Sequence, residues 1–118
     1  MKIAIIGSRN AAFLDLAPYI PKDCTEIVSG GAAGVDRYAA AYAKVHGLAL
    51  TEFLPLYETY GRAAPIIRNK QIAEYADAVI AFWDGASRGT LSVIRYCKKM
   101  GKSCQVIEVR GIGDNNPK

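Results

Sequence analysis

Hydrophobic residues along this chain form short continuous runs, and between these runs they recur at the spacing of a helix face. Five runs predict strands because they are mostly apolar and end at glycine, proline or polar positions: residues 2–6, 26–28, 49–54, 78–83 and 103–109. Four intervening segments predict helices: residues 11–19, 35–45, 65–75 and 89–100. A loop through Tyr57, Tyr60 and Gly61 is predicted between the third strand and the third helix.

This alternation of strands and helices predicts an α/β domain with one mostly parallel five-stranded sheet, covered by helices on both faces in three layers. The most economical strand order is 3-2-1-4-5. Ligands of such sheets bind beyond the carboxyl ends of the strands where the order reverses, here between the first and fourth strands. We therefore expect one domain over residues 1–110 with a site at this edge, followed by a loose tail at 111–118.

Composition adds several constraints. A length of 118 residues, of which 51% are hydrophobic, is typical of one domain with a single core. The net charge of +4 permits binding to nucleotides or nucleic acid but does not require it, because no run of Lys and Arg forms a stripe.

Cys24, Cys97 and Cys104 are too widely spaced for a disulfide framework or a zinc site. The single histidine, His46, has no partner for a metal site or a serine triad. Since no segment has the pattern of a signal peptide or a membrane span, we expect a cytoplasmic protein.

The segment 29–36, with the sequence SGGAAGVD, follows the second predicted strand and leads into a helix. The first amides of a helix lack internal partners and carry the positive end of its dipole, and glycines let a phosphate approach them closely. The alternative is that the glycines only form the turn and pack the helix on the sheet. The loop matches neither a Walker A loop nor the dinucleotide fingerprint. Its candidate ligand-binding residues are Ser29, Gly30, Gly31, Ala32 and Gly34.

Two more loops rich in glycine, serine and arginine follow the first and fourth predicted strands, and we expect them to meet the 29–36 loop at the same sheet edge. Trp83 either stacks on a base there or packs in the core. The hydroxyls of Ser87 and Thr90 are expected to contact a phosphate, and Ser87 is also expected to cap the helix that follows it. The candidate binding residues of these two loops are Gly7, Ser8, Arg9, Trp83, Asp84, Gly85, Ser87, Gly89 and Thr90.

Three further polar residues are candidates for the same site. Arg68 lies in the early turns of a helix near this edge, where its guanidinium can hold a phosphate in bidentate fashion, or it is a solvated helix arginine. Asn69 can bond a base or a sugar, or only the local backbone. Asp36 either binds a ribose hydroxyl or only complements the helix dipole. Asp36 and Asp84 are also the candidate catalytic carboxylates.

In their order and spacing, these motifs resemble the SLOG superfamily, most closely its small YspA-like members. The matching segments cover nearly the whole chain up to Val109: residues 7–9, 29–36, 68–69, 76–83 and 87–90. The resemblance implies a Rossmann-like fold, a homo-oligomer and a nucleotide-derived ligand. It also implies roles for single residues: a phosphate loop at Gly30, Gly31 and Gly34, a site arginine at Arg68, and a second glycine-threonine turn at Gly89 and Thr90.

Two groups within this superfamily suggest different activities. The Lonely Guy enzymes cleave nucleoside monophosphates with a catalytic glutamate three residues after that threonine, where this chain has Val93, which cannot stabilise a developing oxocarbenium charge. DNA-processing protein A binds single-stranded DNA. The expected oligomer can form through helix faces such as Ala39, Ala40 and Ala43, although alanines at this spacing also pack on a sheet.

Three functions therefore follow as expectations. The first is a module that binds a nucleotide or a nucleotide-derived small molecule, as a sensor or accessory protein. The second is a hydrolase of a nucleotide N-glycosidic bond that uses Asp36 or Asp84. The third is a single-stranded DNA binder, for which the candidate contacts are Arg9, Arg62, Arg68 and Arg88.

Overall fold

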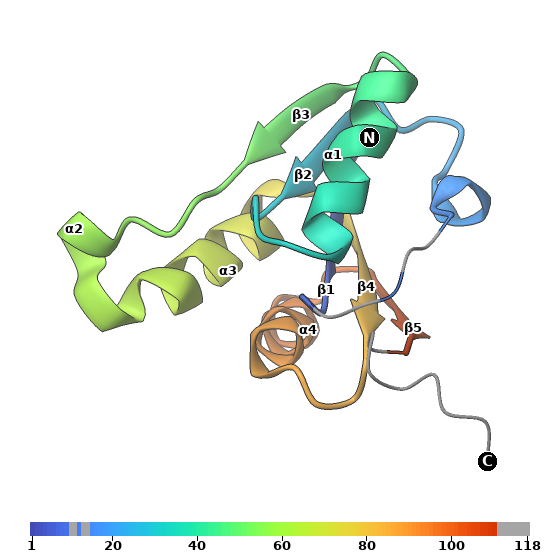
Figure 1. Cartoon of the computed structure of the whole chain (residues 1–118). Helices are drawn as coiled ribbons and strands as arrows, with labels where there is room; N and C mark the ends of the chain where they lie inside the picture. Colours follow the sequence, from blue (N-terminus) through green and yellow to red (C-terminus); the bar gives the residue numbers. More distant parts are fainter. Residues whose placement is uncertain (10–11, 13–14, 111–118) are drawn as a thin grey trace.

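A single sheet of five parallel strands organises the structure (Figure 1). The computed structural model describes residues 1–9, 12 and 15–110. The strands are β1 (Lys2–Gly7), β2 (Glu26–Ser29), β3 (Ala49–Glu52), β4 (Ala78–Trp83) and β5 (Cys104–Glu108). All neighbouring strands pair in parallel, and their order across the sheet is β3-β2-β1-β4-β5. The predicted α/β fold and strand order are confirmed.

Helices cover both faces of the sheet and give three layers (Figure 1). They are α1 (Val35–Val45), α2 (Tyr57–Tyr60), α3 (Ala64–Tyr75) and α4 (Arg88–Met100), with 3₁₀ turns η1 (Ala17–Tyr19) and η2 (Gly61–Ala63). One apolar core joins Ile3 of β1 to Ala39 of α1. The second core joins Ala4 of β1 to Ile72 of α3 and Val93 of α4. Two cores form because successive strand side chains point to opposite faces of the sheet.

The helix predicted at 11–19 differs from the structure. Ala12, Asp15 and Leu16 are not helical, and only the 3₁₀ turn η1 follows them, while residues 10, 11, 13 and 14 lie outside the described part of the chain. Pro18 prevents an α-helix from continuing regularly to residue 19, because proline has no amide to donate to the preceding turn. The side chain of Asp15 instead accepts a hydrogen bond from the Ala17 amide at 3.1 Å. The tail predicted at 111–118 also lies outside the described residues.

The segment predicted as a loop around Tyr57 contains the short helix α2 and the 3₁₀ turn η2, which lead directly into α3. These elements have four and three residues, so they are too short to give a periodic apolar pattern in the sequence. In Figure 1, α2 and the beginning of α3 project away from the sheet as an arm. This arm forms one side of the region in which the predicted site lies.

Two of the alanines of α1 belong to the core. Ala39 and Ala43 are 0% and 1% exposed, because α1 packs them against the sheet. These two alanines are therefore unavailable for self-association and pack on the sheet, whereas Ala40 is half-buried. Within the described residues, no helix is both long enough and apolar enough to cross a bilayer.

Candidate functional site

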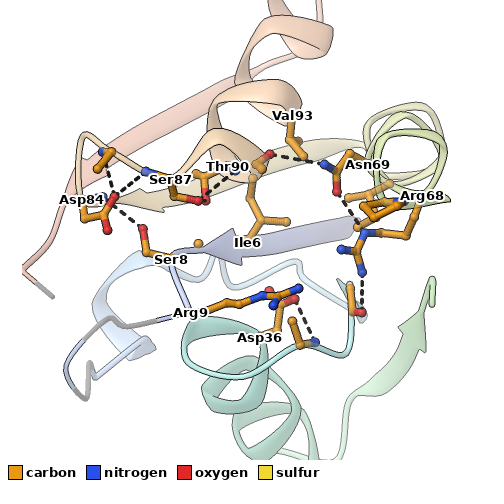
Figure 2. A pocket seen from close by; sticks show the side chains of 17 residues that line it. Ile6, Ser8, Arg9, Asp36, Arg68, Asn69, Asp84, Ser87, Thr90 and Val93 are labelled. Atoms are coloured by element: carbon orange, nitrogen blue, oxygen red, sulfur yellow. Dashed lines mark hydrogen bonds between the residues drawn. The ribbon is translucent and has the colours of Figure 1, made fainter. Parts of the chain in front are cut away.

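A cleft of about 450 Å³ lies at the carboxyl ends of β1 and β4, where the strand order reverses (Figure 2). The loops after β1, β2 and β4 meet there, as the sequence predicts. Twelve of the predicted binding residues line this cleft: Gly7, Ser8, Arg9, Gly30, Ala32, Asp36, Arg68, Asn69, Asp84, Ser87, Gly89 and Thr90. Ser29, Gly31, Gly34, Trp83 and Gly85 do not line it.

The carboxylate of Asp36 occupies the anion position of the glycine loop. Its Oδ2 accepts a hydrogen bond from the Ala32 amide at 3.2 Å, and the Gly30 backbone also bonds to this side chain. Asp36 is only 7% exposed, and burial raises its pKa to about 6, against the opposing effects of these backbone bonds and the Arg68 charge. The backbone of the glycine loop at Ala32 and Gly30 is thus already bonded to a carboxylate of the same chain.

Gly30 separates Arg68 from Asp36. A Cβ atom at this position would lie 2.6 Å from Arg68 Nη1 and 2.9 Å from Asp36 Oδ2. Only glycine lets these two side chains approach the loop from α3 and α1. Gly34, with φ +71°, has a different role, because a Cβ atom at this position would collide with the carbonyl oxygens of Ser8 and Arg9. Gly34 therefore serves the contact between the β1 loop and α1.

Arg68 binds the protein backbone. It is 9% exposed, and its Nη1 donates to the carbonyl oxygens of Gly30 at 2.7 Å and Phe53 at 3.3 Å. Its Nε donates to Asn69 Oδ1 at 2.9 Å. Burial lowers the pKa of Arg68, and the nearby Asp36 charge opposes this change. Since Nη1 and Nε are both used, the predicted bidentate phosphate contact would require these bonds to break.

Asn69 continues this chain of hydrogen bonds across the cleft (Figure 2). Its Nδ2 donates to the Gly89 carbonyl at 3.4 Å, while its Oδ1 accepts from Arg68. Both ends of the side-chain amide are thus bonded within the protein, although neither partner is the local backbone that the sequence-based alternative expected. The result is a continuous link from the glycine loop, through α3, to the beginning of α4.

The beginning of α4 is organised by Ser87. Its Oγ accepts the Thr90 amide at 3.3 Å and lies 3.1 Å from the Thr90 hydroxyl, so Ser87 is the N-cap of this helix. The next amides, those of Arg88 and Gly89, lie in the first turn, where a helix supplies no partner. A Cβ at Gly89 would have no neighbour within 4 Å. This helix end is therefore more open to an anion than the end of α1.

Trp83 lies outside the cleft. It is half-buried, its Nε1 donates to the Ser87 carbonyl at 3.0 Å, and it lines a separate hollow with Glu108 and Arg110. Stacking of Trp83 on a base bound in the cleft is therefore not supported by its position. Its hydrogen bond instead fixes the loop that carries Ser87.

Asp84 also acts on the loop after β4. Its Oδ1 accepts the amides of Ala86 at 2.9 Å and Ser87 at 2.8 Å, and these bonds lower its pKa. Its own amide donates to Ser8 Oγ at 3.2 Å and connects this loop to the loop after β1. An ionised carboxylate with a lowered pKa is a weak base. Both candidate catalytic carboxylates line the cleft, and of the two only Asp36, because of its burial, has a raised pKa.

Sequence reasoning missed five residues that line the cleft: Ile6, Pro65, Ile72, Ala86 and Val93. Ile6, Ile72 and Val93 give the cleft apolar walls. Val93 was detectable, because it follows Thr90 by three residues on a helix and therefore shares its face. Ile72 follows Arg68 by four residues on α3 and was detectable in the same way.

Among the described residues, no three His, Cys, Asp or Glu side chains are grouped so that they could hold a metal ion. No protein-family model matches the chain, and no curated protein or solved structure is significantly similar to it. The relationship to the SLOG superfamily therefore stays a prediction that rests on the sequence motifs.

Proposed function

We propose that this protein binds a nucleotide or a nucleotide-derived small molecule in the cleft, with the ligand phosphate at the beginning of α4. The observation that carries the proposal is the open first turn of α4, where the Ser87 side chain caps only the Thr90 amide, facing a cleft with a buried carboxylate on its other side. The cleft volume of about 450 Å³ is within the range of small-molecule sites. A sensor or accessory module needs no more than such a site.

Several features of α4 support the proposed position of the ligand phosphate. The amides of Arg88 and Gly89 are available and lie at the positive end of the helix dipole. Gly89 has no side chain to obstruct them, and the hydroxyls of Ser87 and Thr90 lie beside them. Arg9 lines the cleft and is exposed, so it can add a positive charge.

Asp36 supports the proposed position of the sugar or base at the other end of the ligand. A carboxylate accepts hydrogen bonds and repels phosphate, so it suits a sugar hydroxyl or an amino group of a base. The apolar side chains of Ile6, Ile72 and Val93 line the same cleft and suit the faces of a base or sugar. This orientation reverses the one that the glycine loop suggests, since the phosphate lies on α4 and not on α1.

A second candidate function is hydrolysis of a nucleotide N-glycosidic bond. It is favoured by the pKa of Asp36, which burial raises to about 6 and so into the range useful for general acid–base catalysis near neutral pH. Val93 occupies the position of the Lonely Guy glutamate, so such a reaction would depend on Asp36 instead. Single-stranded DNA binding has less support in the described structure, because Arg68, one of its four candidate contacts, is buried against backbone carbonyls.

The proposal is tested by thermal unfolding of the protein with adenosine and guanosine mononucleotides, cyclic nucleotides and nucleotide sugars, with products examined by mass spectrometry. A ligand at about 100 times its Kd adds about 2.7 kcal/mol, which raises Tm by several degrees. Gly89→Asp should remove the increase, because it puts a carboxylate at the phosphate position without a steric conflict. Ser92→Asp makes the same charge change on α4 outside the cleft, and this variant should retain the increase in Tm.

Each outcome separates the candidates. An increase in Tm without a change in the nucleotide indicates a binding module. Cleavage of the nucleotide that stops in Asp36→Asn, while binding remains, indicates the hydrolase. Absence of any increase, or equal binding by Gly89→Asp and wild type, contradicts the proposed phosphate position.

Self-association is supported by a different surface from the predicted one. Exposed large apolar side chains gather on and beside the arm that contains α2: Leu54, Leu56, Tyr57, Tyr60 and Ile66. A second copy of the chain on this surface would remove their apolar area from water. Light scattering tests this, since Leu56→Glu should convert an oligomer to a monomer. A monomeric wild-type protein contradicts it.

A further inference from the structure

The excess positive charge of this protein is concentrated on α4 and the turn that follows it. Residues 88–102 contain five Lys and Arg residues and no Asp or Glu. The rest of the chain has ten Lys and Arg residues against eleven Asp and Glu residues, so it carries almost no net charge. The cations of α4 are not consecutive, and the helix decides which of them share a face.

One face of α4 forms a shallow groove with a cationic rim. A hollow of about 480 Å³ is lined by Arg88, Leu91, Ser92, Arg95, Tyr96 and Lys99. The three cations are exposed, whereas the other three side chains are half-buried between them. These positions follow the three- and four-residue spacing of one helix face and extend about 16 Å at 1.5 Å per residue.

The other cations of this segment do not contribute to the groove. Lys98 is exposed on another side of α4 and is not among the lining residues. The Nζ of Lys102 donates to the carbonyl oxygens of Glu74 and Ala76 and so holds the end of α4 against α3. The groove therefore has three cations, Arg88, Arg95 and Lys99, around an apolar floor.

We propose that this groove binds an acidic peptide segment of a partner protein that carries an apolar side chain among its carboxylates. Three cations over about 16 Å match a peptide of about five extended residues. Leu91, Tyr96 and the aliphatic stems of the cations supply the apolar contact. A nucleic acid is a poorer match, because single-strand binding combines a longer cationic track with several stacking aromatics, and this groove has only Tyr96.

The groove and the nucleotide cleft are separate surfaces. No residue lines both, since Arg88 contributes its side chain to the groove and only its backbone amide to the proposed phosphate position beside Gly89. Peptide binding to the groove is therefore independent of the proposed function, and either can fail without the other. A Gly89→Asp variant distinguishes them, because it should lose nucleotide binding and bind the peptide within about twofold of wild type.

The test is fluorescence anisotropy with a labelled synthetic peptide of glutamate, aspartate and leucine, at low and at physiological salt. Lys99→Glu should weaken peptide binding at least about tenfold. Lys98→Glu is the matched control, because it makes the same charge change at the adjacent exposed position, and it should change the affinity less than about twofold. A peptide with serine in place of leucine should bind more weakly, since it lacks the apolar contact.

Three results would overturn the proposal. The first is absence of peptide binding at low salt. The second is an equal effect of Lys98→Glu and Lys99→Glu, which would mean that only net charge matters. The third is tighter binding of an oligothymidylate than of the peptide with the same dependence on Lys99, which would make this face a nucleic-acid surface.

Discussion

The Ala32 amide donates to the carboxylate of Asp36 at 3.2 Å, so the glycine loop of this protein holds an anion that belongs to its own chain. This contact changes the role that we assign to the SGGAAGVD segment. A loop of this kind predicts an external phosphate, but here the carboxylate of the following helix takes that position. The proposed ligand phosphate is therefore assigned to α4.

Asp36 should make the stability of the protein decrease as pH rises. Burial raises its pKa in the folded protein to about 6 from 3.8, so the folded state holds the proton more tightly than the unfolded state. The stabilisation is complete below the lower pKa and is lost as pH rises through the higher one. Two pKa units correspond to about 3 kcal/mol. Urea unfolding of wild type and Asp36→Asn should therefore diverge in favour of the variant, by up to this amount, between pH 4 and 7. A difference that does not depend on pH contradicts the raised pKa.

Substitution of two cleft glycines by alanine should have opposite effects. Gly30→Ala places a methyl group within 3 Å of Arg68 and Asp36, and overpacking of this kind costs about 1–3 kcal/mol. Gly89→Ala places the same group in open space in the first turn of α4, where alanine is the better helix former and stabilises by up to about 1 kcal/mol. Urea unfolding measures both free energies. Equal effects would mean that Gly30 is not crowded by these two side chains.

Arg68→Met should destabilise the protein even without ligand. The change leaves the carbonyl oxygens of Gly30 and Phe53 without this donor, at a cost of about 2–3 kcal/mol. It should also raise the pKa of Asp36 further, because the Arg68 charge lowers it. Arg62→Met, in the exposed turn η2, should change the unfolding free energy by less than about 0.5 kcal/mol. Unchanged stability of Arg68→Met would indicate that this arginine serves the ligand alone.

Two substitutions at Ser87 should separate its role as the N-cap of α4 from its role in ligand binding. Ser87→Ala should lower the free energy of unfolding by about 1 kcal/mol, because the Thr90 amide loses its acceptor. Ser87→Asp should retain most of the stability, since aspartate is an equally good N-cap. It should nevertheless weaken nucleotide binding, because it adds a negative charge beside the proposed phosphate. Equal nucleotide affinity in Ser87→Asp and wild type would place the phosphate elsewhere.

The cleft was largely predictable in location and only partly in detail. Apolar runs and helix ends are local signals, and they were sufficient to bring Ser8, Asp36 and Ser87 to one sheet edge. Trp83 was assigned to the cleft because it ends β4 at that edge, but its indole points to another hollow. Its direction depends on a hydrogen bond to Ser87 that has no signature in the sequence.

The sequence by itself determined the order of the elements, the parallel sheet and the edge at which its loops meet, because these follow from the spacing of apolar residues over a few turns. Only the tertiary structure decided which polar groups remain available. Arg68 reaches the Gly30 carbonyl across 38 positions of the chain, and Lys102 donates to the Glu74 carbonyl across 28 positions. Hydrogen-bond partners of this kind depend on how helices pack on the sheet, and short-range spacing carries no information about the partner that a buried donor finds.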